Sequence, residues 1–172
     1  MPILDILTYP DPRLKKRSTP VEKIDRDIEK LLDDMAETMY DAPGIGLAAP
    51  QVGINLRVII VDISAVEKNS PGLIELINPE IVSVDGEETS EEGCLSIPDF
   101  TSKVKRKAWV KVQGLNRKGE PIERETAGLL ARAFQHEIDH IDGLLFIDRL
   151  SRLKKELIKN KIKKALSNKR ED

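Results

Sequence analysis

The spacing of apolar positions changes several times along the chain, and each change predicts a different element. In residues 25–41 apolar side chains recur every three or four positions, which predicts an amphipathic helix with Asp25 as its N-cap. These positions are Ile28, Leu31, Leu32, Met35 and Met39. Pro43 and Gly44 then end the helix. The glycine-rich residues 44–53 favour a loop or irregular strand where a ligand approaches the backbone.

β-type patterns follow in the middle of the chain. Strands are predicted at residues 57–63, 73–77, 81–84, 104–115 and 121–125. The first is a β-branched run typical of a buried strand, and Asn78-Pro79 separates the second from the third. The last two alternate apolar and polar positions around Arg117, Lys118 and Gly119, which predicts a hairpin.

Helical spacing returns near the C-terminus. Residues 127–141 predict a helix with Thr126 as N-cap and Gly143 as its stop. Residues 151–166 predict a final helix, whose apolar stripe is Leu153, Leu157, Ile158, Ile162 and Leu166. This order of elements predicts an α+β fold, with antiparallel sheets packed around a central helix. We expect one domain over residues 1–172, with 151–172 as a basic helical tail.

Composition narrows the class of protein. The 172 residues are 40% hydrophobic and 34% charged, which suits a packed globular domain rather than a disordered chain. No apolar run approaches the roughly 20 residues that a membrane span needs, and the N-terminus lacks a secretory pattern. The one cysteine excludes an internal disulfide and fits the reducing cytoplasm. Six aromatic residues argue against base stacking as the main activity.

Charge is divided unevenly along the chain. Residues 149–172 hold ten Lys and Arg against three acids, a net +7, and the remainder carries −9. A basic tail on an acidic body suggests a polyanionic partner. A solvated helix face explains the same pattern equally well.

Two histidines are the most informative residues. His136 and His140 lie one turn apart on the predicted helix 127–141, so both imidazoles can reach one metal ion. Glu137 is adjacent and is well placed to act on a water molecule at the metal. The helix is largely apolar, and a metal would give its buried histidines a partner. Two surface histidines on an amphipathic helix are the alternative.

A catalytic metal needs three protein ligands and an open position. The chain has no third histidine, and Glu156 lies in the basic tail, where it is a poor candidate. Cys94 follows a glycine upstream. A lone cysteine is more often a small core residue, but the two histidines without a third ligand favour Cys94 as that ligand. Ligation by Glu92 stays an alternative.

Three segments together resemble the signature motifs of bacterial peptide deformylases. They are GIGLAAPQ at residues 44–51, EGCLS at 92–96 and QHEIDHIDG at 135–143. Their order and spacing match that family over most of residues 2–150. The resemblance implies removal of the N-formyl group from the initiator methionine of nascent polypeptides, with release of formate.

The resemblance also implies a role for each matched residue. The metal ligands would be Cys94, His136 and His140, holding Fe²⁺ in the cell or Zn²⁺, Ni²⁺ or Co²⁺ after purification. Glu137 would be the general acid/base, and Gln51 with the backbone N–H of Leu95 would stabilise the oxyanion. The residues expected to contact substrate are Gly44, Ile45, Gly46, Leu129, Arg132 and Ala133. The basic tail could dock on ribosomal RNA, or its apolar stripe could only pack on the body.

Several positions depart from the family pattern. Ile141 replaces a leucine, and Thr101 stands where many members carry an arginine near the substrate. Arg132 occupies a position by the methionine pocket that tends to be apolar, although its stem could pack there. Arg106 matches a residue that pairs with the motif glutamate, so we expect an ion pair between Glu92 and Arg106 behind Cys94.

Other functions explain less of the sequence. A zinc endopeptidase is the nearest alternative enzyme, and an unformylated internal peptide would distinguish it. An RNA-binding protein with a structural zinc would need a fourth ligand, for which no spare His or Cys exists. A dinucleotide loop at Gly44 and Gly46 lacks the third glycine and the following helix of that fingerprint. We therefore expect no dinucleotide and no membrane partner.

Overall fold

The computed structural model describes residues 3–171, with side chains described for residues 3–168. The helices are α1 (Arg26–Asp41), α2 (Gly128–Ile141) and α3 (Arg152–Glu171). The strands are β1 (Gly46–Ala48), β2 (Val58–Val61), β3 (Ile74–Asp85), β4 (Glu88–Cys94), β5 (Ile97–Arg106), β6 (Trp109–Leu115) and β7 (Pro121–Ala127). Short 3-10 turns lie at Pro12–Lys15, Ala49–Val52 and Phe146–Arg149.

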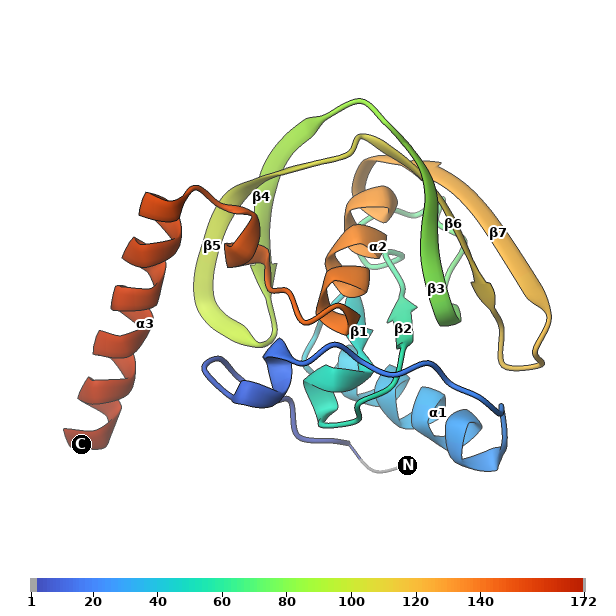
Figure 1. Ribbon diagram of the computed structural model, residues 1–172, viewed down its shortest axis with the longest axis horizontal. Coiled ribbons are helices and arrows are strands. Elements are labelled where there is room, and N and C mark those ends of the chain that lie inside the picture. The colour runs from blue at the N-terminus through green and yellow to red at the C-terminus, as the bar shows by residue number, and fades with distance from the viewer. Residues whose placement is uncertain (1–2, 172) are drawn as a thin grey trace.

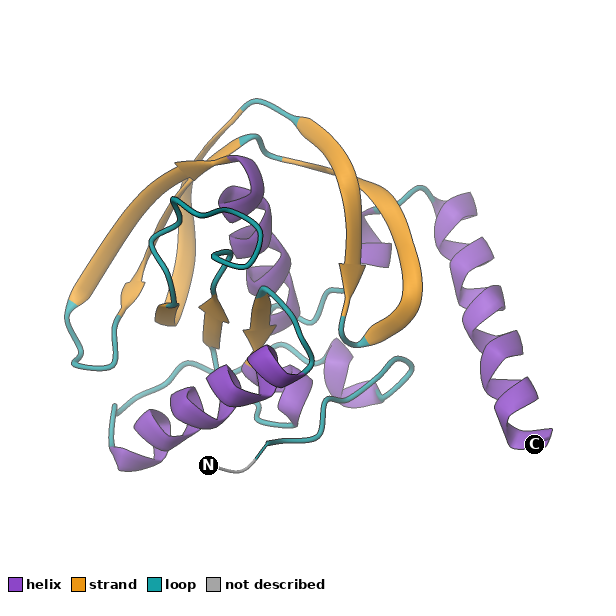
Figure 2. Ribbon diagram, turned by 180° about the vertical axis from the view of Figure 1, so that it is seen from behind, coloured by secondary structure: helices purple, strands orange, loops and turns teal. Residues whose placement is uncertain are grey.

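The strands form two antiparallel sheets. Five strands pair in the order β1-β2-β3-β6-β7, and β4 pairs with β5 in a separate two-stranded sheet. Figure 1 shows α2 in the middle, with β4 and β5 on one side and β6 and β7 on the other. Figure 2 shows the same arrangement from behind, with α3 standing at the edge of the body. The predicted α+β class with a central helix is confirmed.

Strand β2 is buried on both faces because each face is covered by a helix. Val58 and Ile60 belong to a core cluster with the apolar side of α1. Ile59 and Val61 belong to a second cluster with α2. Since successive side chains of a strand point to opposite faces, a strand between two helices must be apolar at every position. This explains the unbroken β-branched run.

Hydrogen bonds to other parts of the chain hold α2 at its middle and at its C-terminal end. The Gln135 side-chain amide accepts from Lys107 N at 2.9 Å and donates to Lys107 O at 2.9 Å. Arg57 Nη1 donates to Ile141 O at 3.0 Å, and its Nη2 donates to Asp142 Oδ1 at 2.8 Å. These hydrogen bonds fix the position of α2 relative to the start of β2 and to the turn between β5 and β6.

The predicted break between strands 73–77 and 81–84 is wrong, because β3 runs through both segments. The pairing of β3 with β6 shifts register between Ile77 and Glu80. Asn78 adopts a positive φ of 53°, and its side chain bonds both N and O of Val21. Asn78 and Pro79 are thus absorbed as a bulge, which bends the strand without ending it.

The predicted strand 104–115 is also wrong, because the chain turns at Lys107 and Ala108. Its first part is the end of β5 and its second part is β6. Strand β4 was not predicted at all. Most of its side chains are exposed, so its sequence carries little apolar alternation to reveal a strand.

The helix ends agree in part with expectation. Asp25 caps α1, since its side chain accepts from Ile28 N at 3.2 Å. The predicted cap Thr126 is wrong, because Ala127 is the N-cap of α2 and Thr126 Oγ1 instead bonds Ala127 O. Gly143 follows α2 with a φ of 81°, as a helix stop requires.

Helix α3 packs on the body through part of its predicted stripe. Ile158 and Ile162 are buried in a third core cluster with residues of β5 and the Phe146–Arg149 turn. Leu153 and Leu157 are 71% and 52% exposed. The side chains at 169–171 and the whole of residue 172 lie outside the described part of the tail. No helix within residues 3–171 is long and apolar enough to cross a membrane.

Candidate metal centre

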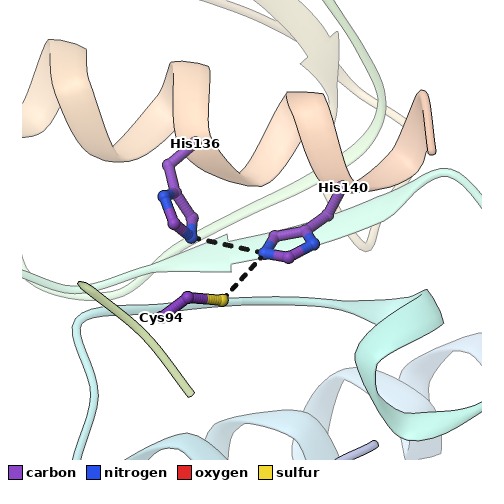
Figure 3. Close-up of side chains that lie close together, drawn as sticks. All are labelled: Cys94, His136 and His140. Carbon is purple, nitrogen blue, oxygen red and sulfur yellow. Dashed lines mark hydrogen bonds between the residues drawn. The ribbon is translucent and has the colours of Figure 1, made fainter. Parts of the chain in front are cut away.

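Cys94, His136 and His140 meet between the small sheet and the central helix. Cys94 ends β4, and the two histidines lie one turn apart on α2 (Figure 3). Cys94 Sγ lies 3.3 Å from His140 Nε2, which in turn lies 3.3 Å from His136 Nε2. The three ligand atoms lie within 4.8 Å of one another. The structure thus brings together the set that the sequence proposed.

This donor set fits a divalent metal ion. Bonds of about 2.0–2.3 Å at tetrahedral angles separate neighbouring ligand atoms by roughly 3.3–3.6 Å. Two of the three separations are 3.3 Å, close to that spacing, and all three ligand atoms lie within 4.8 Å of one another. A thiolate with two imidazoles also leaves one tetrahedral position open, as a catalytic metal requires.

The electrostatics of the site favour one positive charge between the two rings. Burial opposes charging of His136, but Glu137, Cys94 and Glu92 raise the pKa of its ring well above the usual value. Burial and the neighbouring charges of His136 and Arg106 lower the pKa of His140, so this imidazole stays neutral. A metal ion bound at the ring nitrogens would take the place of the proton on His136 and supply that positive charge.

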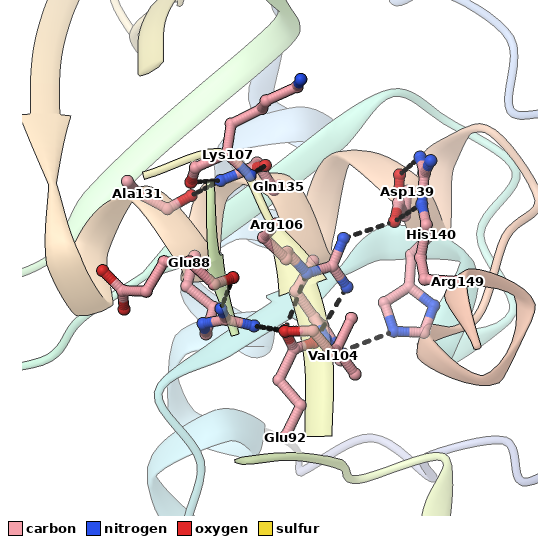
Figure 4. Close-up of polar contacts among 12 residues, drawn as sticks. Glu88, Glu92, Val104, Arg106, Lys107, Ala131, Gln135, Asp139, His140 and Arg149 are labelled. Atoms are coloured by element: carbon pink, nitrogen blue, oxygen red, sulfur yellow. Dashed lines mark hydrogen bonds and ion pairs between the residues drawn. The ribbon is translucent and has the colours of Figure 1, made fainter. Parts of the chain in front are cut away.

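Glu92 orients the first histidine. Its Oε1 accepts from His136 Nδ1 at 2.8 Å, which turns His136 Nε2 toward His140 Nε2 and the ligand cluster. Arg106 holds the same carboxylate through Nε at 2.7 Å and Nη2 at 2.8 Å, so the expected ion pair is confirmed (Figure 4). Burial opposes ionisation of Glu92, yet the hydrogen bonds from Arg106 and His136 hold its pKa well below the usual range.

Asp139 extends this network and was missed by sequence reasoning. It accepts from Arg106 Nη1 at 2.7 Å and from Arg149 Nη2 at 2.6 Å, although the Asp139 side chain is buried (Figure 4). The available signal was its place inside the histidine motif. A buried aspartate one position before a candidate ligand needs cationic partners.

A cavity of about 880 Å³ opens beside the three ligands. Every residue proposed from sequence for the site lines it except His140, which lies beneath its wall and is 1% exposed. The lining residues among them are Gly44, Ile45, Gly46, Gln51, Cys94, Leu95, Leu129, Arg132, Ala133, His136 and Glu137. Three distant motifs therefore share one pocket.

Glu137 faces this cavity with a buried carboxyl group. Burial raises the pKa of Glu137 to about 7. Within the described residues its Oε1 has no hydrogen-bond partner. A buried, unpaired carboxyl group that titrates near neutral pH can accept and return a proton.

Gln51 is held with its amide nitrogen toward the ligands. Its Oε1 accepts from Ala48 N at 3.0 Å, which fixes the orientation of the amide. Its Nε2 lies 3.1 Å from Ser96 Oγ and 3.7 Å from Cys94 Sγ. Ser96, a second residue that was missed, also donates its backbone N–H to Cys94 Sγ at 3.4 Å.

Thr101 and Arg132, which depart from the family pattern, both line the cavity but differ in their surroundings. Thr101 is exposed at the wall and donates to Glu91 Oε1 at 2.8 Å. Arg132 is buried, and its guanidinium contacts the Glu92 carboxylate rather than solvent. The wall beside Leu129 and Ala133 therefore includes Arg132 as predicted, but its charge is compensated.

Comparison with known proteins agrees with this site. A family model described as polypeptide deformylase matches residues 3–156. Peptide deformylase of Thermodesulfovibrio yellowstonii is 58% identical over 163 residues, covering 95% of this chain and 98% of that protein. Peptide deformylase of Syntrophobacter fumaroxidans is 55% identical, covering 96% of this chain and 97% of that protein.

A solved structure extends the likeness to three dimensions. The crystal structure of a peptide deformylase from Legionella pneumophila superposes with a TM-score of 0.89 at 46% identity, covering 99% of both chains. Sequence and fold thus agree over nearly the full length. The chain belongs to the peptide deformylase family, metal-dependent hydrolases that remove N-formyl groups from nascent peptides.

Proposed function

We propose that Cys94, His136 and His140 bind the catalytic ion of this deformylase and that Glu137 is its general acid/base. The observation that carries the proposal is the placement of Glu137. Its buried carboxyl group lies on the cavity wall beside the three ligands and has no partner on Oε1 among the described residues. A bound divalent ion supplies activation of a water molecule near neutral pH.

The side chains of this chain then handle the proton and the developing charge. Glu137 accepts the proton of the attacking water, whose oxygen adds to the formyl carbon. Gln51 Nε2 and the Leu95 N–H donate to the oxyanion, and losing one such donor typically costs about 2.7–4 kcal/mol. Glu137 returns the proton to the amine as the C–N bond breaks. Formate and a free N-terminus leave the site.

The same cavity accounts for selection of the substrate. Leu129, Ala133 and the stem of Arg132 give an apolar wall for the methionine side chain. Gly44 and Gly46 let a peptide backbone approach closely. Formyl is the smallest acyl group, so a narrow site at the ligands admits it and excludes larger ones.

The native ion is proposed to be Fe²⁺, with Zn²⁺, Ni²⁺ or Co²⁺ as substitutes. One thiolate and two imidazoles suit both iron and zinc. Anaerobic purification followed by metal analysis and a formate-release assay tests this choice. Iron content with oxygen-sensitive activity supports it, and full activity that tracks zinc alone contradicts it.

Glu137→Gln tests the proposed base. Formate release from formyl-Met-Ala-Ser should fall at least a hundredfold, because the amide cannot accept a proton. Glu125→Gln, an exposed change on β7, is the matched control and should leave the rate unchanged. Full activity of Glu137→Gln would exclude this role. Cleavage of an unformylated internal peptide alone would favour an endopeptidase.

Docking of α3 on the ribosome is a further part of the proposal, with residues 1–172 as one cytoplasmic domain. Leu153 and Leu157 are exposed on this basic helix, while Ile158 and Ile162 attach it to the body. Replacing the exposed Lys161 with Gln should weaken co-sedimentation with ribosomes, and rising salt should do the same. Co-sedimentation that stays the same after the Lys161 substitution and at high salt would contradict docking through α3. Packing on the body would then be the function left for this helix.

A further inference from the structure

Arg132 lies on the wall of the catalytic cavity and also forms a buried hydrogen-bond network behind it, and the deformylase reaction does not by itself require the second feature. It lies on α2 one turn before His136, and its side chain is 6% exposed. It lines the catalytic cavity, yet its guanidinium contacts three acceptors behind the wall. These acceptors are the Glu92 carboxylate, Val104 O at 2.9 Å and Glu88 O at 2.9 Å.

The hydrogen bond from Arg132 to Glu92 fills the last acceptor site of that carboxylate. Glu92 Oε1 accepts from Arg106 Nη2 and from His136 Nδ1. Glu92 Oε2 accepts from Arg106 Nε and from Arg132 Nη1. A carboxylate offers about four acceptor sites, so these four bonds leave it no freedom to turn. The carboxylate that orients His136 is thereby fixed from two sides.

The other two acceptors join the small sheet to the central helix. Glu88 O belongs to β4 and Val104 O to β5, and both strands lie beside α2 (Figure 4). Strand β4 ends at Cys94, whereas α2 carries the two histidines. Arg132 therefore connects the element that supplies the sulfur to the element that supplies the nitrogens.

We propose that Arg132 is a positioning residue for the metal ligands. It fixes Glu92 and holds the β4–β5 sheet against α2, so that Cys94 Sγ and the imidazoles stay at ligating separation. The inference rests on the proposed ligand set. A lysine could contact the carboxylate but lacks the planar group that reaches three acceptors at once.

Three variants separate this role from a purely structural one. Arg132→Met keeps an apolar stem on the cavity wall and removes all three hydrogen bonds. Arg132→Lys keeps the charge and one donor group. Arg149→Met is the matched control, because Arg149 donates to Asp139 in the same network and its side chain is 46% exposed. Within the described residues it makes no hydrogen bond to Glu92.

Each variant is loaded with Co²⁺, and the readouts are its visible spectrum and the rate of Co²⁺ release to a chelator. Release from Arg132→Met should be about tenfold faster, within the range known for lost partners of metal ligands. Its cobalt d–d bands should shift, while KM for a formyl-Met peptide stays within twofold. Arg132→Lys should be intermediate, and Arg149→Met should match the unaltered enzyme.

The outcomes distinguish this inference from the function on which it rests. If the unaltered enzyme shows no thiolate-to-cobalt charge-transfer band, the proposed Cys94 ligation fails. If that band is present and Arg132→Met releases Co²⁺ at the unaltered rate, the positioning role is wrong, even where thermal stability falls. Should Arg132→Met not fold, the same comparison on Arg132→Lys decides.

Discussion

Gly46 of β1 lies directly against the carboxylate of Glu137 on α2. A Cβ added at residue 46 would overlap Glu137 Oε2, and would also lie 2.9 Å from Glu137 Cδ. Strand and helix approach this closely only because residue 46 has no side chain. The glycine of the first motif thus sets the space in which the proposed general base stands.

Gly46→Ala should therefore damage catalysis more than stability. The new methyl group must displace the Glu137 carboxylate, and we expect kcat to fall at least tenfold because misplaced catalytic groups are costly. Gly44→Ala is the comparison, since its Cβ would meet Leu95 Cδ1, the movable end of a side chain, at 2.8 Å. Steady-state formate release checks both. Equal effects of the two changes would contradict this account.

Gln51→Met should lower kcat by about 10²–10³-fold, because an oxyanion donor is lost in a buried site. KM should change little, since the donor acts on charge that develops in the transition state. Ser96→Ala removes only the Oγ that lies 3.1 Å from Gln51 Nε2, so its effect should be much smaller. Kinetics with a formylated tripeptide measure both, and a large rise in KM for Gln51→Met would show a role in substrate binding instead.

Asp148 should make stability depend on pH in the acid range. Burial opposes its ionisation, but bonds from Leu145 N, Lys155 and Lys15 lower the pKa of Asp148 to about 2. The folded pKa lies below that of the unfolded chain, so this contribution is complete above about pH 4 and disappears as pH falls toward 2.

Asp148→Asn should cost roughly 1–2 kcal/mol of unfolding free energy at pH 7. The difference from the unaltered protein should close near pH 2. Urea unfolding at several pH values measures it, with the exposed Asp85→Asn as control. A difference that stays constant with pH would mean that the ion pairs of Asp148 contribute nothing.

The contribution of α3 packing to stability can be measured with a matched pair of substitutions to alanine. Ile162 is 6% exposed in the core cluster beneath α3, whereas Leu157 is 52% exposed. Ile162→Ala should lower the unfolding free energy by about 2–4 kcal/mol. Leu157→Ala should stay within about 0.5 kcal/mol. Equal losses in chemical denaturation would show that α3 packs through a different face.

Local patterns predicted the helices and two of the ligands, and long-range contacts account for what the sequence could not reveal. His136 and His140 share a helix, so their separation follows from helical geometry alone. Cys94 reaches them only through the β4–β5 sheet. Strand β4 is mostly exposed and carries no strong alternation, so the pattern of apolar positions missed it.

The partners of charged residues were harder to predict than the residues themselves. The pairing of Glu92 with Arg106 followed from the family resemblance. The second guanidinium on Glu92, from Arg132, depends on how α2 lies across two strands. No spacing along the chain encodes that contact, because Glu92 and Arg132 are 40 residues apart.

The hydrogen bonds that hold α2 through Gln135 and Arg57 bear on how the protein loses and takes up its metal ion. Both histidines lie on a helix that is anchored by amide and guanidinium contacts within the chain. Because these contacts do not involve the ligand atoms, we expect the ion to leave and return without refolding of α2. We expect the metal-free protein to keep this fold and to bind a divalent ion again when one is supplied.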